Sequence, residues 1–199
     1  MKIITFSGVD GSGKSSQLAF FQKELESTGV KAAYFHAVHF SLPQAAKRLF
    51  QREARHPGDA KAVTKSSGAG ILLRKVVLLF DLFRFHRYLK RLERSGINHL
   101  ISDRYFYDSL VNIAYLDGTS LSTPYANFAA RFIPKPDKAF FLSVSPEAIM
   151  CRERAPEQGL QYLKDKQALF QEATTLWGFI TIDGNAPLND VRTAVSAHL

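Results

Sequence analysis

The octapeptide GVDGSGKS, from Gly8 to Ser15, matches the phosphate-loop pattern G-x-x-x-x-G-K-[ST] at every fixed position. The apolar run Ile3–Phe6 precedes it, and a helical pattern that includes Leu18, Phe21 and Leu25 follows. Chance alone gives the four fixed positions in roughly one chain in a hundred of this length, and the strand and helix context lowers that further. The octapeptide therefore predicts a nucleoside triphosphate site, and a glycine-rich turn that only begins a helix is the disfavoured alternative.

The spacing within the octapeptide fits the chemistry of phosphate binding. Its glycines let the backbone curl around a phosphate with N–H groups pointing inward, and the following helix adds its positive N-terminal end. We expect Lys14 to lie across the β- and γ-phosphates of ATP and the Ser15 hydroxyl to contribute to a Mg²⁺ site. The predicted ATP-binding residues are Gly8, Asp10, Gly11, Ser12, Gly13, Lys14, Ser15 and Ser16.

The composition is that of a compact enzyme with a single domain, residues 1–199. The chain is 46% hydrophobic, enough for a substantial core without disulfides or a structural metal. The single cysteine, Cys151, excludes an internal disulfide. The first predicted strand begins at Lys2, so we expect no signal peptide. Charged residues interrupt the most apolar run, Ile71–Phe85, which excludes a membrane span there. We therefore expect a cytoplasmic protein that contacts no membrane.

The positive charge is concentrated in one region. Between Lys47 and Arg94 there are thirteen Lys and Arg against four Asp and Glu, a net of +9, so the rest of a chain of net charge +8 sums to −1. Such a region could hold a phosphorylated substrate, cover an acidic partner or touch nucleic acid. For Arg87, Lys90 and Arg91, with Arg94, the pattern favours the solvated face of a long helix.

Strands and helices alternate along the chain. Short apolar runs predict strands at Lys2–Ser7, Val30–His36, His99–Ser102, Lys138–Val144 and Phe179–Ile182. Helical periodicity predicts helices at Lys14–Thr28, Pro43–Arg55, Ile71–Arg94, Asp108–Leu116, Pro146–Arg154, Gln161–Leu176 and Leu188–Ala197. This order predicts an α/β fold of three layers, in which a five-stranded parallel sheet has helices on both faces and binds ligands at the carboxyl ends of its strands.

Several further patterns carry a resemblance to a known family. The opening ITFSGVDGSGKSSQL is similar to the thymidylate kinases and their relatives among the P-loop nucleoside monophosphate kinases. The other matching positions are Asp103, Arg104 and Tyr105 (D-R-Y) with Ser102 before them and Ser109 after, Phe80 and Arg84 (F-x-x-x-R), and Pro146, Glu147, Arg152 and Arg154 (P-E…R-x-R). The resemblance covers most of the chain.

The resemblance implies transfer of the ATP γ-phosphoryl group, with Mg²⁺, to a nucleoside monophosphate, dTMP by default. It implies an acceptor-binding region at about 36–95 and a short lid at about 152–161. The acceptor-binding residues that it implies are Asp10, Phe80, Arg84, Arg104, Tyr105 and Ser109. The implied metal ligands are Ser15 and Asp103. The candidate catalytic residues are Lys14, Asp10, Arg152 and Arg154. ATP and a small phosphorylated acceptor are the expected partners; nucleic acid is not expected, and a homodimer is left open.

Each matched residue also has a plainer interpretation. Asp103 could be a turn or cap residue instead of a metal ligand, and Arg104 could be a surface arginine instead of a bidentate phosphate ligand. Arg84 fits a phosphate or base ligand and a snorkelling residue equally well, whereas Phe80 is more typical of a core than of a base-stacking ring. Asp10 could be a solvated loop aspartate.

The lid arginines have a specific predicted role. The loop has Gly11 and Ser12 where some relatives place an arginine, so positive charge for the transition state must come from elsewhere. We expect Arg154, with Arg152, to lie over the transferring phosphoryl group when the lid closes. The alternative is that both arginines form weak ion pairs on an exposed helix.

Two segments depart from the thymidylate kinase pattern. The sequence HAVHFSLP, residues 36–43, stands where the family carries R-E-P-G-G, and Val111, Asn112 and Ile113 stand where it recognises thymine. Asn112 could supply an amide to the base, although a helix-surface asparagine is the favoured interpretation. Another phosphorylated metabolite as acceptor, or an ATP-binding regulatory module that contacts an acidic partner, are therefore the alternatives.

Overall fold

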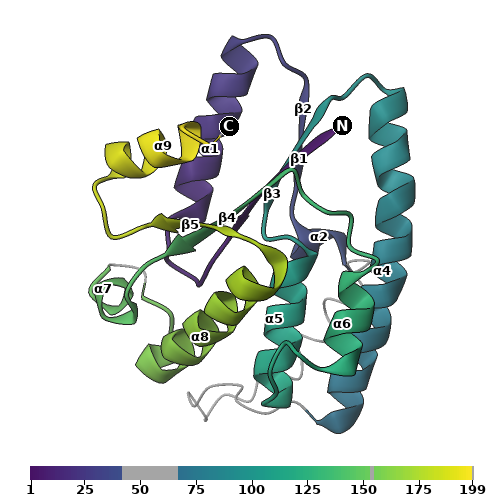
Figure 1. Ribbon diagram of the computed structural model, residues 1–199, viewed down its shortest axis with the longest axis vertical. Coiled ribbons are helices and arrows are strands. Elements are labelled where there is room, and N and C mark those ends of the chain that lie inside the picture. The colour runs from purple at the N-terminus through teal and green to yellow at the C-terminus, as the bar shows by residue number, and fades with distance from the viewer. Residues whose placement is uncertain (42–66, 153–154, 199) are drawn as a thin grey trace.

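The structure is a computed structural model that describes residues 1–41, 67–152 and 155–198 (Figure 1). The strands are β1 (Lys2–Ser7), β2 (Ala32–Phe35), β3 (His99–Asp103), β4 (Lys138–Ser143) and β5 (Ile180–Asp183). The helices are α1 (Lys14–Ser27), α2 (Ala37–Phe40), α4 (Gly68–Arg94), α5 (Phe106–Asp117), α6 (Pro124–Ala130), α7 (Pro146–Met150), α8 (Gly159–Trp177) and α9 (Leu188–Ser196).

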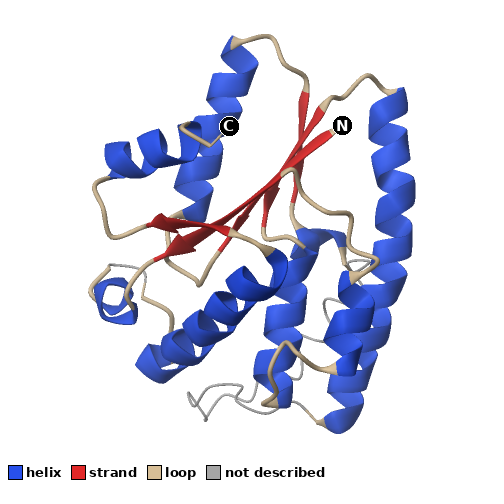
Figure 2. Cartoon of the chain, viewed as in Figure 1, coloured by secondary structure: helices blue, strands red, loops and turns tan. Residues whose placement is uncertain are grey.

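The five strands form one parallel sheet in the order β2-β3-β1-β4-β5 (Figure 2). In register, Phe6 of β1 lies opposite Asp103 of β3, so the strand that leads into the phosphate loop ends beside the D-R-Y sequence. The sequence-based prediction of a five-stranded parallel sheet is confirmed, because each predicted strand overlaps an observed one.

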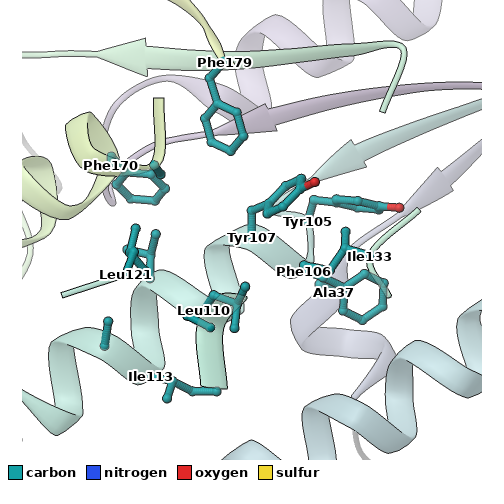
Figure 3. Close-up of a cluster of buried hydrophobic side chains, with 14 of the residues drawn as sticks. Ala37, Tyr105, Phe106, Tyr107, Leu110, Ile113, Leu121, Ile133, Phe170 and Phe179 are labelled. Carbon is teal, nitrogen blue, oxygen red and sulfur yellow. The ribbon is translucent and has the colours of Figure 1, made fainter. Parts of the chain in front are cut away.

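Helices cover both faces of the sheet because alternate residues of its central strands point to opposite sides. Ile4 and Phe6 pack with Leu18 and Phe21 of α1 and with α9 on one face. On the other face, Ile3 belongs to a larger core that takes in α4, α5 and α8. Buried residues of α5 run through the centre of this core (Figure 3). The fold is therefore a three-layer α/β architecture, as predicted.

Two short helices were not predicted. Helix α2 has four residues, too few for a periodic pattern. Helix α6 carried a start signal that could have been found, since Thr123 caps it through Ala126 N and Pro124 occupies its first turn. The predicted helix Pro43–Arg55 and most of the predicted connection His56–Gly70 lie outside the described residues.

The long helix α4 carries much of the basic region. Its residues Arg87, Lys90, Arg91 and Arg94 are exposed, which confirms their prediction as a solvated face. Apolar residues of α4 are exposed as well, namely Leu72, Leu73, Val76, Phe80 and Phe83. Of the helices in the described ranges, none has the length and apolar character needed to cross a membrane.

Candidate active site

The phosphate loop connects β1 to α1 in a conformation that requires its glycines. Gly8, Gly11 and Gly13 have φ of 147°, 83° and 93°, a region that residues with a Cβ rarely adopt. A Cβ on Gly8 would also lie 2.9 Å from the carbonyl oxygen of Leu142, so the loop is held against β4. No side chain caps α1 at Gly13, which leaves the first N–H groups of this helix for an anion.

Lys14 is held inside the loop. Its side chain is buried, and Nζ donates hydrogen bonds to the Val9 carbonyl oxygen (2.8 Å) and the Ser12 hydroxyl (3.3 Å). Burial, and then the nearby positive charge of Arg104, lowers the pKa of Lys14 to about 8. A phosphate is the natural partner for this desolvated ammonium, because anionic oxygens would replace the two weak neutral acceptors.

Ser15 and Asp103 lie together at the edge of the sheet. The Ser15 hydroxyl donates a hydrogen bond of 2.9 Å to Asp103 Oδ2, although 88 residues separate them. Asp103 is the last residue of β3 and is buried, and its other carboxylate oxygen, Oδ1, has no hydrogen-bond partner among the described residues. A hydroxyl and a buried carboxylate with an unused oxygen suit the oxygen-seeking Mg²⁺, which takes few ligands from the protein and keeps several waters.

Arg104 has the only positive φ, 63°, of any non-glycine residue in the described ranges. Its main chain holds this conformation, since the N–H donates to Phe6 O (3.1 Å) and the carbonyl accepts from Ala37 N (3.1 Å) and Ser102 Oγ (2.9 Å). Such a conformation costs about 1–3 kcal/mol and persists where surrounding contacts impose it, often at functional sites. The conformation aims the Arg104 side chain at the phosphate loop, where it pairs with Asp10.

Asp10 connects the loop to α8. One carboxylate oxygen accepts from Arg104 and the other from the Tyr162 hydroxyl at 3.2 Å. Burial would raise the pKa of Asp10, but Arg104 and then Lys14 outweigh it and lower the pKa below its ordinary value. Asp10 is therefore a charged bridge between the guanidinium and the lid-side helix, although its side chain is still 41% exposed.

A cavity of about 550 Å³ opens beside these groups. The loop residue Asp10 and Arg104 form part of its wall, and α4, α5, α8 and the segment after β2 form the rest. Its lining includes Val38, His39, Ser41, Arg74, Val77, Leu78, Tyr105, Asp108, Ser109, Asn112, Ile113, Tyr162, Lys166 and Phe170. Its volume falls in the range of cavities that hold small-molecule ligands.

Some cavity residues were missed by sequence reasoning. Asp108, which is buried, accepts hydrogen bonds from Ser7 Oγ (2.6 Å) and Tyr105 N (2.9 Å), and burial raises the pKa of its carboxyl group. Tyr162 and Lys166 were also missed, although their i, i+4 spacing in a helical pattern places them on one face of α8. Arg74 of α4 was missed because charged residues recur along that whole helix.

The structure does not bring Phe80 and Arg84 to the cavity. Phe80 is 61% exposed, so it is neither in the core nor against the cavity wall. Arg84 pairs with the buried Asp81 at 2.9 Å and stacks on the ring of Phe40 at 4.8 Å. Both residues lie on α4, but the cavity uses a different part of that helix, around Arg74 and Leu78.

Other predicted residues are near the cavity in different ways. Ser109 lines it, as does Tyr105, whose hydroxyl donates to Pro134 O (2.9 Å) and whose side chain is fully buried. Asn112 also lines the cavity and accepts from Lys166, so its interpretation as a helix-surface residue is wrong.

The lid segment is partly described. The Arg152 side chain donates to the carbonyl oxygen of Gly11 and, at 3.5 Å, to that of Gly184, so it lies across the phosphate loop. It forms no ion pair within the described part of the chain. Arg154, the other candidate, lies outside the described residues. Arg152 is thus the described lid residue that is close to the predicted donor site.

The parallel sheet, the phosphate loop and the adjoining cavity define a P-loop enzyme of the nucleotide kinase class. No family model matches the chain. The chain is 26% identical to a probable thymidylate kinase of Archaeoglobus fulgidus over 97% of its own length and 92% of that protein. It is 24% identical to a probable thymidylate kinase of Pyrobaculum aerophilum (98% and 95% covered) and 23% identical to a thymidylate kinase of Schizosaccharomyces pombe (98% and 89%).

These matches run through nearly the whole of each relative and converge on one kind of protein. The chain is thymidylate kinase-like, which confirms the resemblance seen in its motifs. It is an enzyme of the nucleoside monophosphate kinase type, a phosphotransferase that acts on a nucleoside monophosphate.

Proposed function

We propose that this enzyme transfers the γ-phosphoryl group of ATP, with Mg²⁺, to a nucleoside monophosphate, with dTMP as the default acceptor. The observation that carries the proposal is the convergence of three groups: Lys14 in the loop, the Ser15–Asp103 pair at the end of β3, and Arg104 at the wall of the cavity. In this proposal they would form the donor site, the metal site and the acceptor site, one beside the next.

On the donor side, the loop N–H groups and Lys14 would hold the β- and γ-phosphates. Ser15 and Asp103 would hold Mg²⁺, which supplies neutralisation of phosphate charge. Lys14 is already desolvated and oriented, so it stabilises charge without waiting for solvent to reorganise. ATP binding would use Gly8, Asp10, Gly11, Ser12, Gly13, Lys14, Ser15 and Ser16.

On the acceptor side, Arg104 would hold the phosphate of the monophosphate by a bidentate contact. Asp10, which accepts a hydrogen bond from the Tyr162 hydroxyl, orients the Arg104 guanidinium, and the cavity beyond them would take the sugar and base. The carboxylate of Asp10 also offers an acceptor for a sugar hydroxyl. Tyr105 and Ser109 complete the proposed acceptor site; Phe80 and Arg84 are not supported as part of it.

The lid would supply the remaining positive charge. Arg152 lies over the loop, and Arg154 follows two residues later in the chain. Closure of this segment would bring one or both guanidinium groups to the transferring phosphoryl group and exclude water, which would otherwise compete as the acceptor.

The organisation of the chain belongs to the same proposal. A single kinase domain would span 1–199, with an acceptor-binding region at about 36–95 and a lid at about 152–161. A homodimer stays a prediction, which sedimentation velocity would test.

The test is a two-part assay on the purified protein. A coupled assay with ATP, Mg²⁺ and each nucleoside monophosphate in turn should give ADP only when an acceptor is present, and EDTA should abolish the signal. A thermal-shift screen with a non-hydrolysable ATP analogue should find the same acceptor, because a ligand that binds the folded state raises the melting temperature.

A different phosphorylated acceptor is the second candidate, favoured by HAVHFSLP at residues 36–43 and by Val111–Ile113, where the chain departs from thymidylate kinases. ADP release with such a compound, and with no nucleotide, would decide for it.

A further inference from the structure

A buried lysine projects into the cavity from α8. Lys166 is 6% exposed, and its Nζ donates a hydrogen bond of 2.8 Å to Asn112 Oδ1 of α5. Lysine is almost never this buried without an ionic partner. Among the described residues, no carboxylate lies within ion-pair distance of Lys166. The rings of Tyr115 (5.2 Å) and Tyr162 (5.7 Å) lie beside it, and the charges of Arg104, Asp10 and Asp108 act on it from beyond ion-pair distance.

The unused hydrogen-bonding groups of the Lys166–Asn112 pair are mostly donors. An ammonium has three N–H donors and no acceptor, so the amide oxygen of Asn112 must face it, and the amide NH₂ then faces elsewhere. Lys166 keeps two unused donors as well. The two residues line one cavity and place several donors in the part of it between α5 and α8, while the carboxyl groups of Asp10 and Asp108 lie elsewhere in the same lining.

Asn112 lies within α5, beyond Arg104, the proposed phosphate ligand, although the charge of Arg104 also acts on Lys166. Arg104 precedes α5, whereas Asn112 lies six residues beyond the start of that helix at Phe106, which is a rise of about 9 Å. Ile113, next to Asn112, and Phe170, one turn after Lys166, are both buried and line the same cavity. Apolar walls with a few placed donors suit a flat heterocycle that carries oxygen acceptors.

We propose that Lys166 and Asn112 determine base specificity, by donating to a nucleobase that carries a ring oxo group where cytosine and adenine carry an amino group. This inference rests on the proposed function, since it concerns the acceptor of that reaction. An oxo group on the base accepts a hydrogen bond from the buried ammonium of Lys166. An amino group on the base is itself a donor, so it cannot pair with the ammonium and leaves this desolvated charge without a partner. Sites that hydrogen-bond a ligand reject the mismatched analogue strongly for this reason.

The test compares dUMP with dCMP, which differ in the group at position 4 of the ring. For the wild-type enzyme we expect kcat/KM for dUMP to exceed that for dCMP by at least tenfold. Lys166→Met should bring the ratio to within about threefold, mainly through KM. Lys164→Met is the matched control, because Lys164 lies on the same helix but is half-exposed and pairs with Glu147 at 3.1 Å. It should keep the wild-type ratio.

A second variant guards against a failure of Lys166→Met to fold. Asn112→Asp adds a carboxylate beside Lys166, which occupies the ammonium and removes the amide donors, so it should also collapse the ratio. Equal losses for both nucleotides in either variant would overturn the inference, because a merely structural role lowers binding of both.

Equilibrium binding of the two nucleotides, measured by calorimetry, separates this inference from the proposed function. An enzyme that binds dUMP more tightly than dCMP through Lys166, but transfers no phosphate, would contradict the proposed function and support the inference. An enzyme that phosphorylates a nucleotide with the same base preference before and after Lys166→Met would overturn the inference alone. Binding of neither nucleotide would overturn both.

Discussion

The phosphate loop and the acceptor cavity differ in how the chain builds them. Eight consecutive residues, Gly8–Ser15, make the loop, and two of its partners, Asp103 and Arg104, are adjacent at the end of one strand. The cavity instead draws residues from α4, α5, α8 and the segment after β2. The fixed positions of the contiguous loop cannot change without loss of phosphate binding, whereas a cavity made of distant helices can change its specificity one side chain at a time. This chain keeps the phosphate-loop pattern and departs from the thymidylate kinase pattern at residues of the acceptor cavity.

The largest effect is expected at the loop. Lys14→Ala should lower kcat by about 10²–10³, because it removes preorganised positive charge from the transferring group. Its melting temperature should not fall, since burial of this ammonium is itself unfavourable. Steady-state kinetics and a thermal melt check both, with Lys23→Ala, an exposed position on α1, as the control. Unchanged turnover in Lys14→Ala would remove the donor assignment.

Arg104→Lys tests the junction between the two regions. The lysine keeps the charge but loses the planar pair of donors, so we expect kcat/KM for the acceptor to fall by about tenfold to a hundredfold, with KM for ATP little changed. Varying acceptor and ATP separately measures this split. A defect confined to ATP binding would mean that Arg104 serves the loop and not the cavity.

The lid arginine Arg152 should give an intermediate effect. Arg152→Ala removes a guanidinium that lies over Gly11, and we expect kcat to fall at least tenfold with little change in thermal stability. Arg192→Ala on α9 is the control, since Arg192 is remote from the loop and stacks on the ring of Phe20. Arg154→Ala, measured in the same way, tests the predicted contribution of Arg154 to phosphoryl transfer. A kcat close to that of the wild type in both variants would instead indicate that Arg152 and Arg154 are surface arginines with no part in phosphoryl transfer.

The pH dependence should be the mildest of the four effects. Burial and then Arg104 lower the pKa of Lys14 to about 8, so the free enzyme loses this positive charge as pH rises through 8. We expect kcat/KM for ATP to fall by up to about tenfold between pH 8 and pH 9.

Burial also lowers the pKa of Lys166 to about 8, so the profile should be repeated in Lys166→Met. Persistence of the decline in that variant would attribute it to Lys14, and its disappearance would contradict that attribution.

The sequence by itself determined the phosphate-loop conformation and the sheet. The loop Gly8–Ser15 is a contiguous stretch whose glycines are required by the backbone conformation. A short apolar run marked each strand, and the alternation of strands with helices indicated that the strands are parallel. The D-R-Y sequence also pointed correctly to the end of β3, where Asp103 meets Ser15.

Only the tertiary structure decided the composition of the cavity. Lys166 meets Asn112 because α5 and α8 pack together, and no local pattern records that contact across 54 residues. Arg84 pairs with Asp81 of its own helix, whereas Arg74 lines the cavity because α4 packs against α5 there. The two arginines look alike in an amphipathic helix with charges along its length. Helical periodicity fixes which side chains share a face, whereas the neighbour of that face is set by how the helices pack on the sheet.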